Sequence, residues 1–285
     1  MDEYKRAKGL LFAQLGNSYR EENLNFAILN GDDEAHIYYQ QVTPAQVLTY
    51  GIDNPDVDVR ATDIQIDGQG TAFTVECFKG TEKFHLQMLG KFNVYNALAT
   101  ISVGLVEGLS LEGIKKSIEG MKGVRGRMEP VHVGQNFSVV VDYAHTPDSL
   151  ENVLKTCQEF VHNGKIYCVV GCGGNRDRSK RPIMANIAVQ YADKAVFTSD
   201  NPRSEDPNEI LEEMIRGVKD QGIEDGKYVS MVDRKEAIEW AIRQAQKNDI
   251  VLIAGKGHET YQEINGKKYP FDDREWAIEF LQQKK

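Results

Sequence analysis

The chain has 285 residues, of which 41% are hydrophobic and 27% charged, and its formal net charge is −9. These values are typical of a globular protein that is long enough for two hydrophobic cores. The negative charge and the lack of a basic cluster argue against a nucleic-acid partner. The apolar runs are too short to span a bilayer, and we expect no secretory signal. The spacings of the cysteines match no zinc-binding or disulfide framework. We therefore expect a cytoplasmic protein that has no membrane partner.

Residues 1–124 mix helical and extended patterns. Helices are predicted at 2–14, 32–39, 94–107 and 111–119, and extended segments at 25–29, 47–50, 59–66, 72–78 and 83–88. Glycine-containing turns separate the last three extended segments, so we expect them to form an antiparallel meander. The Gly-rich stretch 120–126 is the best candidate for a linker. We place the domain boundary between residues 124 and 125.

Residues 125–285 have a regular alternation of strands and helices. Continuous apolar strands are predicted at 138–141, 166–170, 195–198, 228–232 and 250–254. They alternate with helices predicted at 149–161, 181–191, 208–218, 235–246 and 274–283. This alternation predicts an α/β domain with a Rossmann-like, mostly parallel sheet.

Four of these strands are followed directly by polar residues. The four strand ends are Asp142–Pro147, Gly171–Asp177, Asp200–Arg203 and Gly255–Thr260. Ligands of open α/β sheets bind at the carboxyl ends of strands. Because one polar strand end is ordinary but four at one sheet edge can form a pocket, we expect these segments to share one binding site.

The turn Asp200-Asn201-Pro202-Arg203 is the most informative of the four. It combines an acid, an amide and a guanidinium on a proline-stiffened turn, which suits a small zwitterionic ligand. The alternative is an ordinary turn between a strand and a helix, in which Ser204 or Asp206 caps the helix that follows.

Six separated motifs together carry a resemblance to a known family. They are Gly90–Ala99, Gly126–Glu129, Asp142–His145 and the three later strand ends. In this order they closely resemble the Mur ligases and, within them, the UDP-N-acetylmuramoyl-tripeptide synthetases, which add the third residue of the peptidoglycan stem. The resemblance covers essentially the whole chain. It implies an ATP-dependent amide ligase with a central nucleotide domain and a Rossmann-like C-terminal domain that brings the incoming amino acid.

In that family, a carboxylate of the UDP-linked muramoyl dipeptide takes the γ-phosphoryl group of ATP, and the amine of the amino acid attacks the resulting acyl phosphate. The family's phosphate loop, G-x-x-x-x-G-K-[ST], does not occur here, because all five Gly-Lys pairs are followed by other residues. We therefore expect residues 1–124 to be a partial central domain, and we expect the chain not to catalyse ligation by itself. We also expect a monomer. The alternatives are a non-catalytic amino-acid-binding fragment, a lysine-adding enzyme or a related Mur-type ligase.

The resemblance also implies residues for ATP and Mg²⁺. Asn93 and Asn96 match the asparagines on the adenine side, and Arg127 and Asp142 match contacts of the C-terminal domain to the nucleotide. Lys8 matches a lysine that is carboxylated by CO₂ and then helps to hold Mg²⁺, which requires a lowered lysine pKa. The ordinary alternatives are a helix cap for Asn93, a salt bridge for Arg127 or Asp142, and an exposed helix lysine for Lys8.

The Asp-Asn-Pro-Arg form of the turn implies meso-diaminopimelate as the amino acid, since forms without the arginine occur with lysine. Lysine lacks the second carboxylate, which a planar guanidinium can bind through two hydrogen bonds. The resemblance implies that Arg203 and Arg176 hold carboxylates and that Glu259 pairs with an ammonium. The remaining implied ligand-binding residues are Asp200, Asn201, Pro202 and Gly255. A solvated loop arginine and a plain turn are the alternatives for Arg176 and Gly255.

Overall fold

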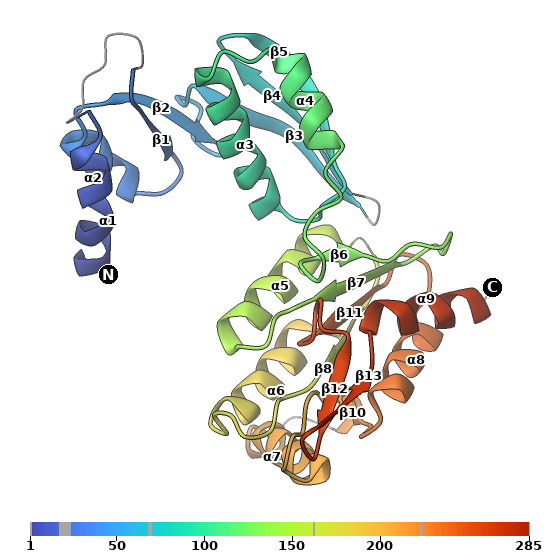
Figure 1. The fold of residues 1–285 in the computed structure, drawn as a ribbon. Helices are drawn as coiled ribbons and strands as arrows, with labels where there is room; N and C mark the ends of the chain where they lie inside the picture. The colour runs from blue at the N-terminus through green and yellow to red at the C-terminus, as the bar shows by residue number, and fades with distance from the viewer. Residues whose placement is uncertain (1, 17–23, 68–69, 162, 223–224, 285) are drawn as a thin grey trace. The chain divides into compact units, whose positions relative to one another are not determined.

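The computed structural model describes residues 2–16, 24–67, 70–161, 163–222 and 225–284. Within this part of the chain, no helix is long and apolar enough to cross a membrane. Contacts divide the chain into two compact units (Figure 1). Unit 1 comprises residues 1–66, 70–87 and 91–122, and unit 2 comprises residues 67–69, 88–90 and 123–285. The functional boundary at 124/125 remains a proposal.

Unit 1 contains a five-stranded sheet with the order β1-β2-β3-β4-β5. The strands are β1 (Phe26–Asn30), β2 (Gln46–Gly51), β3 (Val59–Asp67), β4 (Gly70–Cys77) and β5 (Gly80–Leu86). β1, β2 and β3 run parallel to one another, whereas β4 and β5 are antiparallel. The helices are α1 (Asp2–Gln14), α2 (Ala35–Val42), α3 (Lys91–Val106) and α4 (Leu111–Glu119). Helix α3 packs on β1 and β2, and α4 packs on β5.

Two helix starts predicted in unit 1 are wrong. Helix α2 begins at Ala35 rather than residue 32, because the Asp32 carboxylate accepts hydrogen bonds from the backbone of residues 52–54 and holds Asp32 in a turn. Helix α3 begins at Lys91, three residues earlier than predicted, so Asn93 lies inside the first turn and is not a cap. The predicted antiparallel pairing of the last two extended segments is confirmed by β4 and β5.

Unit 2 contains a six-stranded sheet with the order β10-β9-β8-β11-β7-β6. The strands are β6 (Glu129–Pro130), β7 (Ser138–Asp142), β8 (Ile166–Val170), β9 (Lys194–Phe197), β10 (Tyr228–Ser230) and β11 (Ile250–Ala254). All neighbouring pairs are parallel except β6 and β7. The predicted Rossmann-like sheet is thus confirmed, although the short strand β6 was not predicted.

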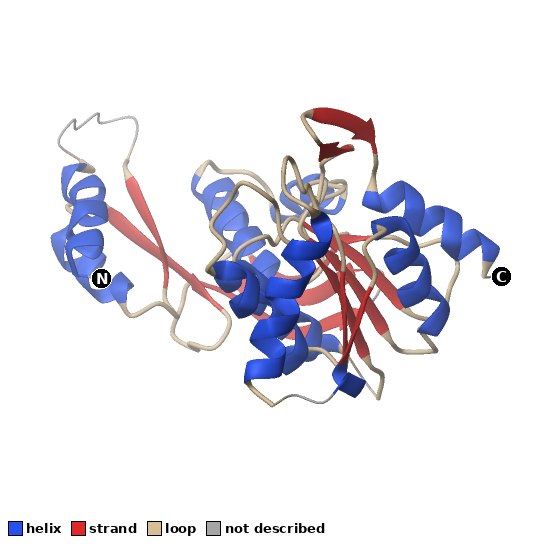
Figure 2. Cartoon of the chain, turned by 90° about the horizontal axis from the view of Figure 1, so that it is seen from below, coloured by secondary structure: helices blue, strands red, loops and turns tan. Residues whose placement is uncertain are grey.

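Helices cover both faces of this sheet (Figures 1 and 2). They are α5 (Pro147–Phe160), α6 (Lys180–Tyr191), α7 (Pro207–Asp220), α8 (Arg234–Gln244) and α9 (Asp273–Gln283), with a short 3-10 helix at Asp225–Lys227. One core joins alternate residues of β7, β8 and β11, such as Val139, Val169 and Val251, to α8 and α9. The intervening strand residues are buried too, which explains why these strands have continuous apolar sequences.

A hairpin that the sequence analysis missed follows β11. Strands β12 (Tyr261–Ile264) and β13 (Lys267–Pro270) pair antiparallel. The turn residues Asn265 and Gly266 have φ values of 49° and 73°, the left-handed conformation that an Asn-Gly turn adopts. Ile264 also forms a bridge with Arg203, so the hairpin docks on the turn after β9.

Candidate functional site

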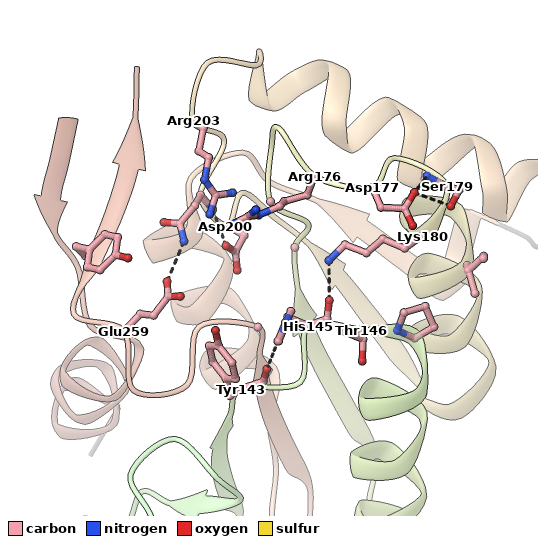
Figure 3. A pocket seen from close by; sticks show the side chains of 17 residues that line it. Tyr143, His145, Thr146, Arg176, Asp177, Ser179, Lys180, Asp200, Arg203 and Glu259 are labelled. Carbon is pink, nitrogen blue, oxygen red and sulfur yellow. Dashed lines mark hydrogen bonds between the residues drawn. The ribbon is translucent and has the colours of Figure 1, made fainter. Parts of the chain in front are cut away.

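A cavity of about 640 Å³ lies in unit 2 at the carboxyl ends of β7, β8, β9 and β11. All four polar strand ends contribute to its lining, as the sequence led us to expect. Six of the residues predicted to bind the amino acid face it together: Arg176, Asp200, Asn201, Arg203, Gly255 and Glu259. In Figure 3 the side chains of Arg176 and Arg203 lie near Asp200, and Glu259 lies below Arg203 in this view. The predicted residue Pro202 is buried and does not line the cavity.

The alternative that the turn after β9 only caps the following helix accounts for Asp206 but not for Asp200 and Asn201. Asp206 is the N-cap of α7, where its side chain accepts a hydrogen bond from the Asn208 amide. Asp200 and Asn201 play no part in that cap, because their side chains lie at the cavity, 8% and 3% exposed. Buried polar side chains at a cavity are typical of a binding site.

Gly255 allows two strand ends to approach each other closely. Its φ is 117°, and a Cβ atom added there would lie 2.9 Å from Oδ2 of Asp200. The other carboxylate oxygen of Asp200 accepts a hydrogen bond of 2.6 Å from the Asn201 amide. Any larger residue at position 255 would displace the Asp200 side chain from the cavity wall.

Arg203 is held in one orientation by the structure around it. Its Nη1 donates to the carbonyl oxygen of Gly174 at 2.8 Å, and its Nε lies 3.5 Å from a carboxylate oxygen of Glu263 on β12. Its backbone, with φ of 52°, exchanges hydrogen bonds with Glu263 and Asn265 of the hairpin. The guanidinium group is therefore positioned before any ligand arrives, which lowers the entropy cost of binding.

A charged clasp fixes the loop after β8 to the turn after β9. The Gly174 amide donates to the Asn201 carbonyl oxygen at 2.9 Å, and Glu205 accepts from the Asn175 amide. The fully buried Arg181 pairs with Glu205 at 2.9 Å and with Glu213 at 2.8 Å. The hydrogen bond from Arg181 is the main reason that the pKa of Glu205 is lowered. This network stabilises the wall that carries Arg176 and Arg203.

Some residues in and beside the cavity were given no role of their own from the sequence. His145 and Lys180 face the cavity, and Lys180 Nζ donates to the His145 carbonyl oxygen at 2.8 Å. Glu263 on β12 contacts Arg203. The Asn265-Gly266 pair is a strong hairpin signal and would have placed Glu263 on a hairpin strand.

The residues assigned to ATP lie outside this cavity. In unit 1, Asn96 Nδ2 donates to Asn93 Oδ1 at 3.3 Å, so the two side chains share one face of α3. In unit 2, Asp142 is 7% exposed and accepts hydrogen bonds of 2.7 Å from the amides of Met128 and Ala144. Burial nevertheless raises the pKa of Asp142. Asp142 thus fixes the turn that carries Arg127, and the nucleotide contacts remain a prediction.

The described residues do not fit the predicted Mg²⁺ site. Lys8 is exposed on α1, and its Nζ lies 4.5 Å from the centroid of the Tyr4 ring. The neighbouring Tyr4 hydroxyl raises the pKa of Lys8, whereas carboxylation by CO₂ requires a lowered pKa. No group of three or more His, Cys, Asp or Glu side chains that could hold a metal occurs in the described part of the chain.

Comparisons with known proteins identify the family. The Mur ligase middle domain matches residues 1–104, and the domain described as "Mur ligase, glutamate ligase domain" matches residues 126–257. The chain belongs to the Mur ligase family. Relatives include UDP-N-acetylmuramoyl-L-alanyl-D-glutamate–2,6-diaminopimelate ligases of Bacillus velezensis, 53% identical over 97% of this chain and 55% of that protein, and of Bacillus cereus, 53% identical over 99% of this chain and 56% of that protein.

Solved structures of Mur ligases share the fold. A structure titled as a UDP-N-acetylmuramoyl-L-alanyl-D-glutamate–2,6-diaminopimelate ligase superimposes with a TM-score of 0.73 at 37% identity, covering 99% of this chain and 56% of that one. A Mur ligase of Thermotoga maritima in complex with ADP gives a TM-score of 0.56 at 16% identity, covering 91% of this chain and 53% of that one. The chain thus spans about half the length of the Mur ligases that it matches.

Proposed function

We propose that this chain supplies the amino-acid-binding part of a Mur ligase that adds meso-diaminopimelate to UDP-N-acetylmuramoyl-L-alanyl-D-glutamate. The observation that carries the proposal is the cavity at the four strand ends, where guanidinium and carboxylate side chains face one another. Diaminopimelate has an ammonium and a carboxylate at each end. Such a ligand offers a partner to Arg203, Arg176 and Glu259 at once, whereas lysine leaves a guanidinium without its carboxylate.

In the proposed reaction, the γ-phosphoryl group of ATP is transferred to a carboxylate of the UDP-linked muramoyl dipeptide, which releases ADP. The amine of diaminopimelate then attacks the acyl carbon and forms the amide, while inorganic phosphate leaves and the amine loses a proton. The role of this chain is to orient that amine, which can remove much of the entropic barrier of a reaction between two substrates. Asn93, Asn96, Arg127 and Asp142 are proposed to contact ATP. Because the substrates are soluble precursors, we place the reaction in the cytoplasm. We also propose that the protein is a monomer.

Two alternatives differ from this proposal in what they require of the cavity. A fragment that binds an amino acid without turnover needs the same cavity and no phosphate loop, and the phosphate-loop motif does not occur in these 285 residues. We therefore propose that the chain by itself binds the amino acid but does not ligate it. A lysine-adding ligase has no use for Arg203 at the cavity wall, which disfavours that alternative.

The test is to measure the binding of meso-diaminopimelate and of L-lysine to the purified chain by calorimetry. We expect diaminopimelate to bind more tightly. Arg203→Ala should weaken diaminopimelate binding roughly tenfold to a hundredfold, because it leaves a ligand carboxylate without its charge-assisted partner. The loss is smaller than for a fully buried pair because this side chain is 24% exposed. Lysine binding should change little, and Arg203→Lys should restore diaminopimelate binding only in part.

Arg216→Ala is the matched control, since Arg216 is exposed on α7 and does not line the cavity. It should leave both affinities unchanged. If the wild-type chain binds neither amino acid, or if Arg203→Ala weakens both by the same factor, the proposed specificity is wrong.

A further inference from the structure

Lys256 is a fully buried lysine that contacts two residues lining the proposed amino-acid site. It follows β11 in the loop Gly255-Lys256-Gly257, and its side chain is 0% exposed. Its Nζ donates to Oδ1 of Asn201 at 3.1 Å and to Oε2 of Glu259 at 3.1 Å. Burying an ammonium is costly unless it is paired and hydrogen-bonded. Here both partners are residues to which we assign ligand binding.

Lys256, Asn201 and Glu259 form a closed triangle of hydrogen bonds. Asn201 Nδ2 donates to the same Oε2 of Glu259 at 2.8 Å (Figure 3). Asn201 Oδ1, which accepts from Lys256, also accepts from the Glu263 amide of β12 at 2.9 Å. The triangle therefore fixes the rotamers of Asn201 and Glu259. Both hydrogen bonds to the Glu259 carboxylate end on Oε2, which leaves Oε1 for a ligand ammonium.

Lys256 also sets the charge balance of the site. Arg176 and Arg203 line the cavity together with Asp200 and Glu259. Lys256 and Glu263 do not line it but pair with Glu259 and Arg203, so cationic and anionic side chains around the triangle are equal in number, three of each. On the opposite wall, Lys180 and Asp177 add one charge of each sign. A neutral site suits a ligand of zero net charge. At neutral pH diaminopimelate has zero net charge, whereas lysine has a net charge of +1.

We propose that Lys256 is a positioning and specificity-determining residue, whose buried ammonium orients Asn201 and Glu259 and offsets one negative charge so that the site favours diaminopimelate over lysine. This inference rests on the proposed function. Without Lys256 the site would carry one net negative charge beside Glu259. A bare ammonium would then bind more favourably than before, and a ligand with both an ammonium and a carboxylate would bind less favourably.

The experiment compares diaminopimelate and lysine binding to the wild-type chain, Lys256→Met and Lys256→Gln by calorimetry. Lys256→Met removes the donor and the charge, whereas Lys256→Gln keeps a donor without the charge. We expect both variants to lower the ratio of the two affinities, in favour of lysine, by roughly tenfold or more at low salt, and by less at high salt because the effect is electrostatic. If Lys256→Met does not fold, Lys256→Gln makes the same comparison.

Lys268→Met is the matched control, because Lys268 is exposed and lies 4.0 Å from the ring of Tyr261, which Lys256 also approaches, at 5.6 Å. It should leave the ratio unchanged. A merely structural role predicts that both ligands lose affinity equally, and that result, or an unchanged ratio, would overturn the inference while the proposed function stands. A wild-type chain that does not bind diaminopimelate would instead refute the proposed function.

Discussion

A single carboxylate organises the turn between β1 and α2. Asp32 accepts hydrogen bonds from the amides of Ile52, Asp53 and Asn54 at 2.6–3.1 Å and from the Tyr95 hydroxyl at 2.8 Å. Burial alone would raise its pKa, but these four hydrogen bonds together hold the pKa of Asp32 below its ordinary value. Burial, and then the same hydrogen bond to Asp32, raise the pKa of Tyr95. Asp32 thereby ties the segment after β2 to the first two turns of α3, where Asn93 and Asn96 lie.

Asp32→Asn should destabilise the chain at neutral pH, because an amide cannot accept all of these bonds. We expect a loss of about 1–2 kcal/mol, less than for a fully buried group. A lowered folded-state pKa gives stability that is present above the unfolded pKa of about 3.9 and is lost as the pH falls through the folded value. The difference between variant and wild type should therefore stay constant from pH 7 to about 5 and shrink below about pH 4.

Urea unfolding at a series of pH values measures this difference. Asp56→Asn is the control, since Asp56 is exposed in the same region and should show little effect at any pH. A deficit that grows as the solution is acidified has the wrong sign and would contradict the assignment.

At the scale of secondary-structure elements, the hydrophobic pattern of the sequence predicted those strands and helices whose residues are buried in a regular pattern. The strands of unit 2 are covered on both faces, so their apolar runs stood out, and the polar residues at their ends were found to share one cavity. Local chemistry shifted the element ends: the hydrogen bonds of Asp32 delay the start of α2. The contact of Glu263 with Arg203 could not be predicted, because it depends on the docking of the hairpin on the turn after β9. Lys256 lies in a predicted strand end, but periodicity does not show that its side chain is buried against Asn201.

The substitution Gly174→Ala tests the clasp between the loop after β8 and the turn after β9. A Cβ atom added at Gly174 would lie 2.0 Å from the carbonyl oxygen of Pro202, which is backbone and cannot rotate away. Gly174→Ala should therefore separate the two segments and break the hydrogen bond from Arg203 to residue 174. We expect a loss of stability of about 1–3 kcal/mol, as for other overpacked sites, and weaker diaminopimelate binding.

Gly226→Ala is the matched control, because an added Cβ at Gly226 meets no atom within 4 Å. Unfolding in urea and calorimetry report the two effects. If Gly174→Ala binds diaminopimelate as tightly as the wild type, the clasp does not position Arg203.

At the scale of the whole molecule, unit 2 contains its own core and its own site. The core residues shared by the sheet, α8 and α9 run from Val131 to Leu281, and the cavity is lined by residues between Tyr143 and Tyr261. Arg234 strengthens this core from within: it is fully buried, pairs with the buried Asp273 at 2.7 Å and donates to the Ala254 carbonyl oxygen at 3.0 Å. All of these interactions lie within residues 123–285.

Residues 123–285, expressed alone, should therefore fold and bind diaminopimelate with an affinity within about twofold of that of the whole chain, since a domain with its own core can fold independently. Circular dichroism with thermal unfolding and calorimetry measure the two properties. The same fragment with Val251→Asp, which buries an unpaired charge in the core, should not fold and provides the baseline. A folded fragment that binds diaminopimelate more than about tenfold more weakly would show that residues 1–122 contribute to the site, and an unfolded fragment would show that they are needed for the fold.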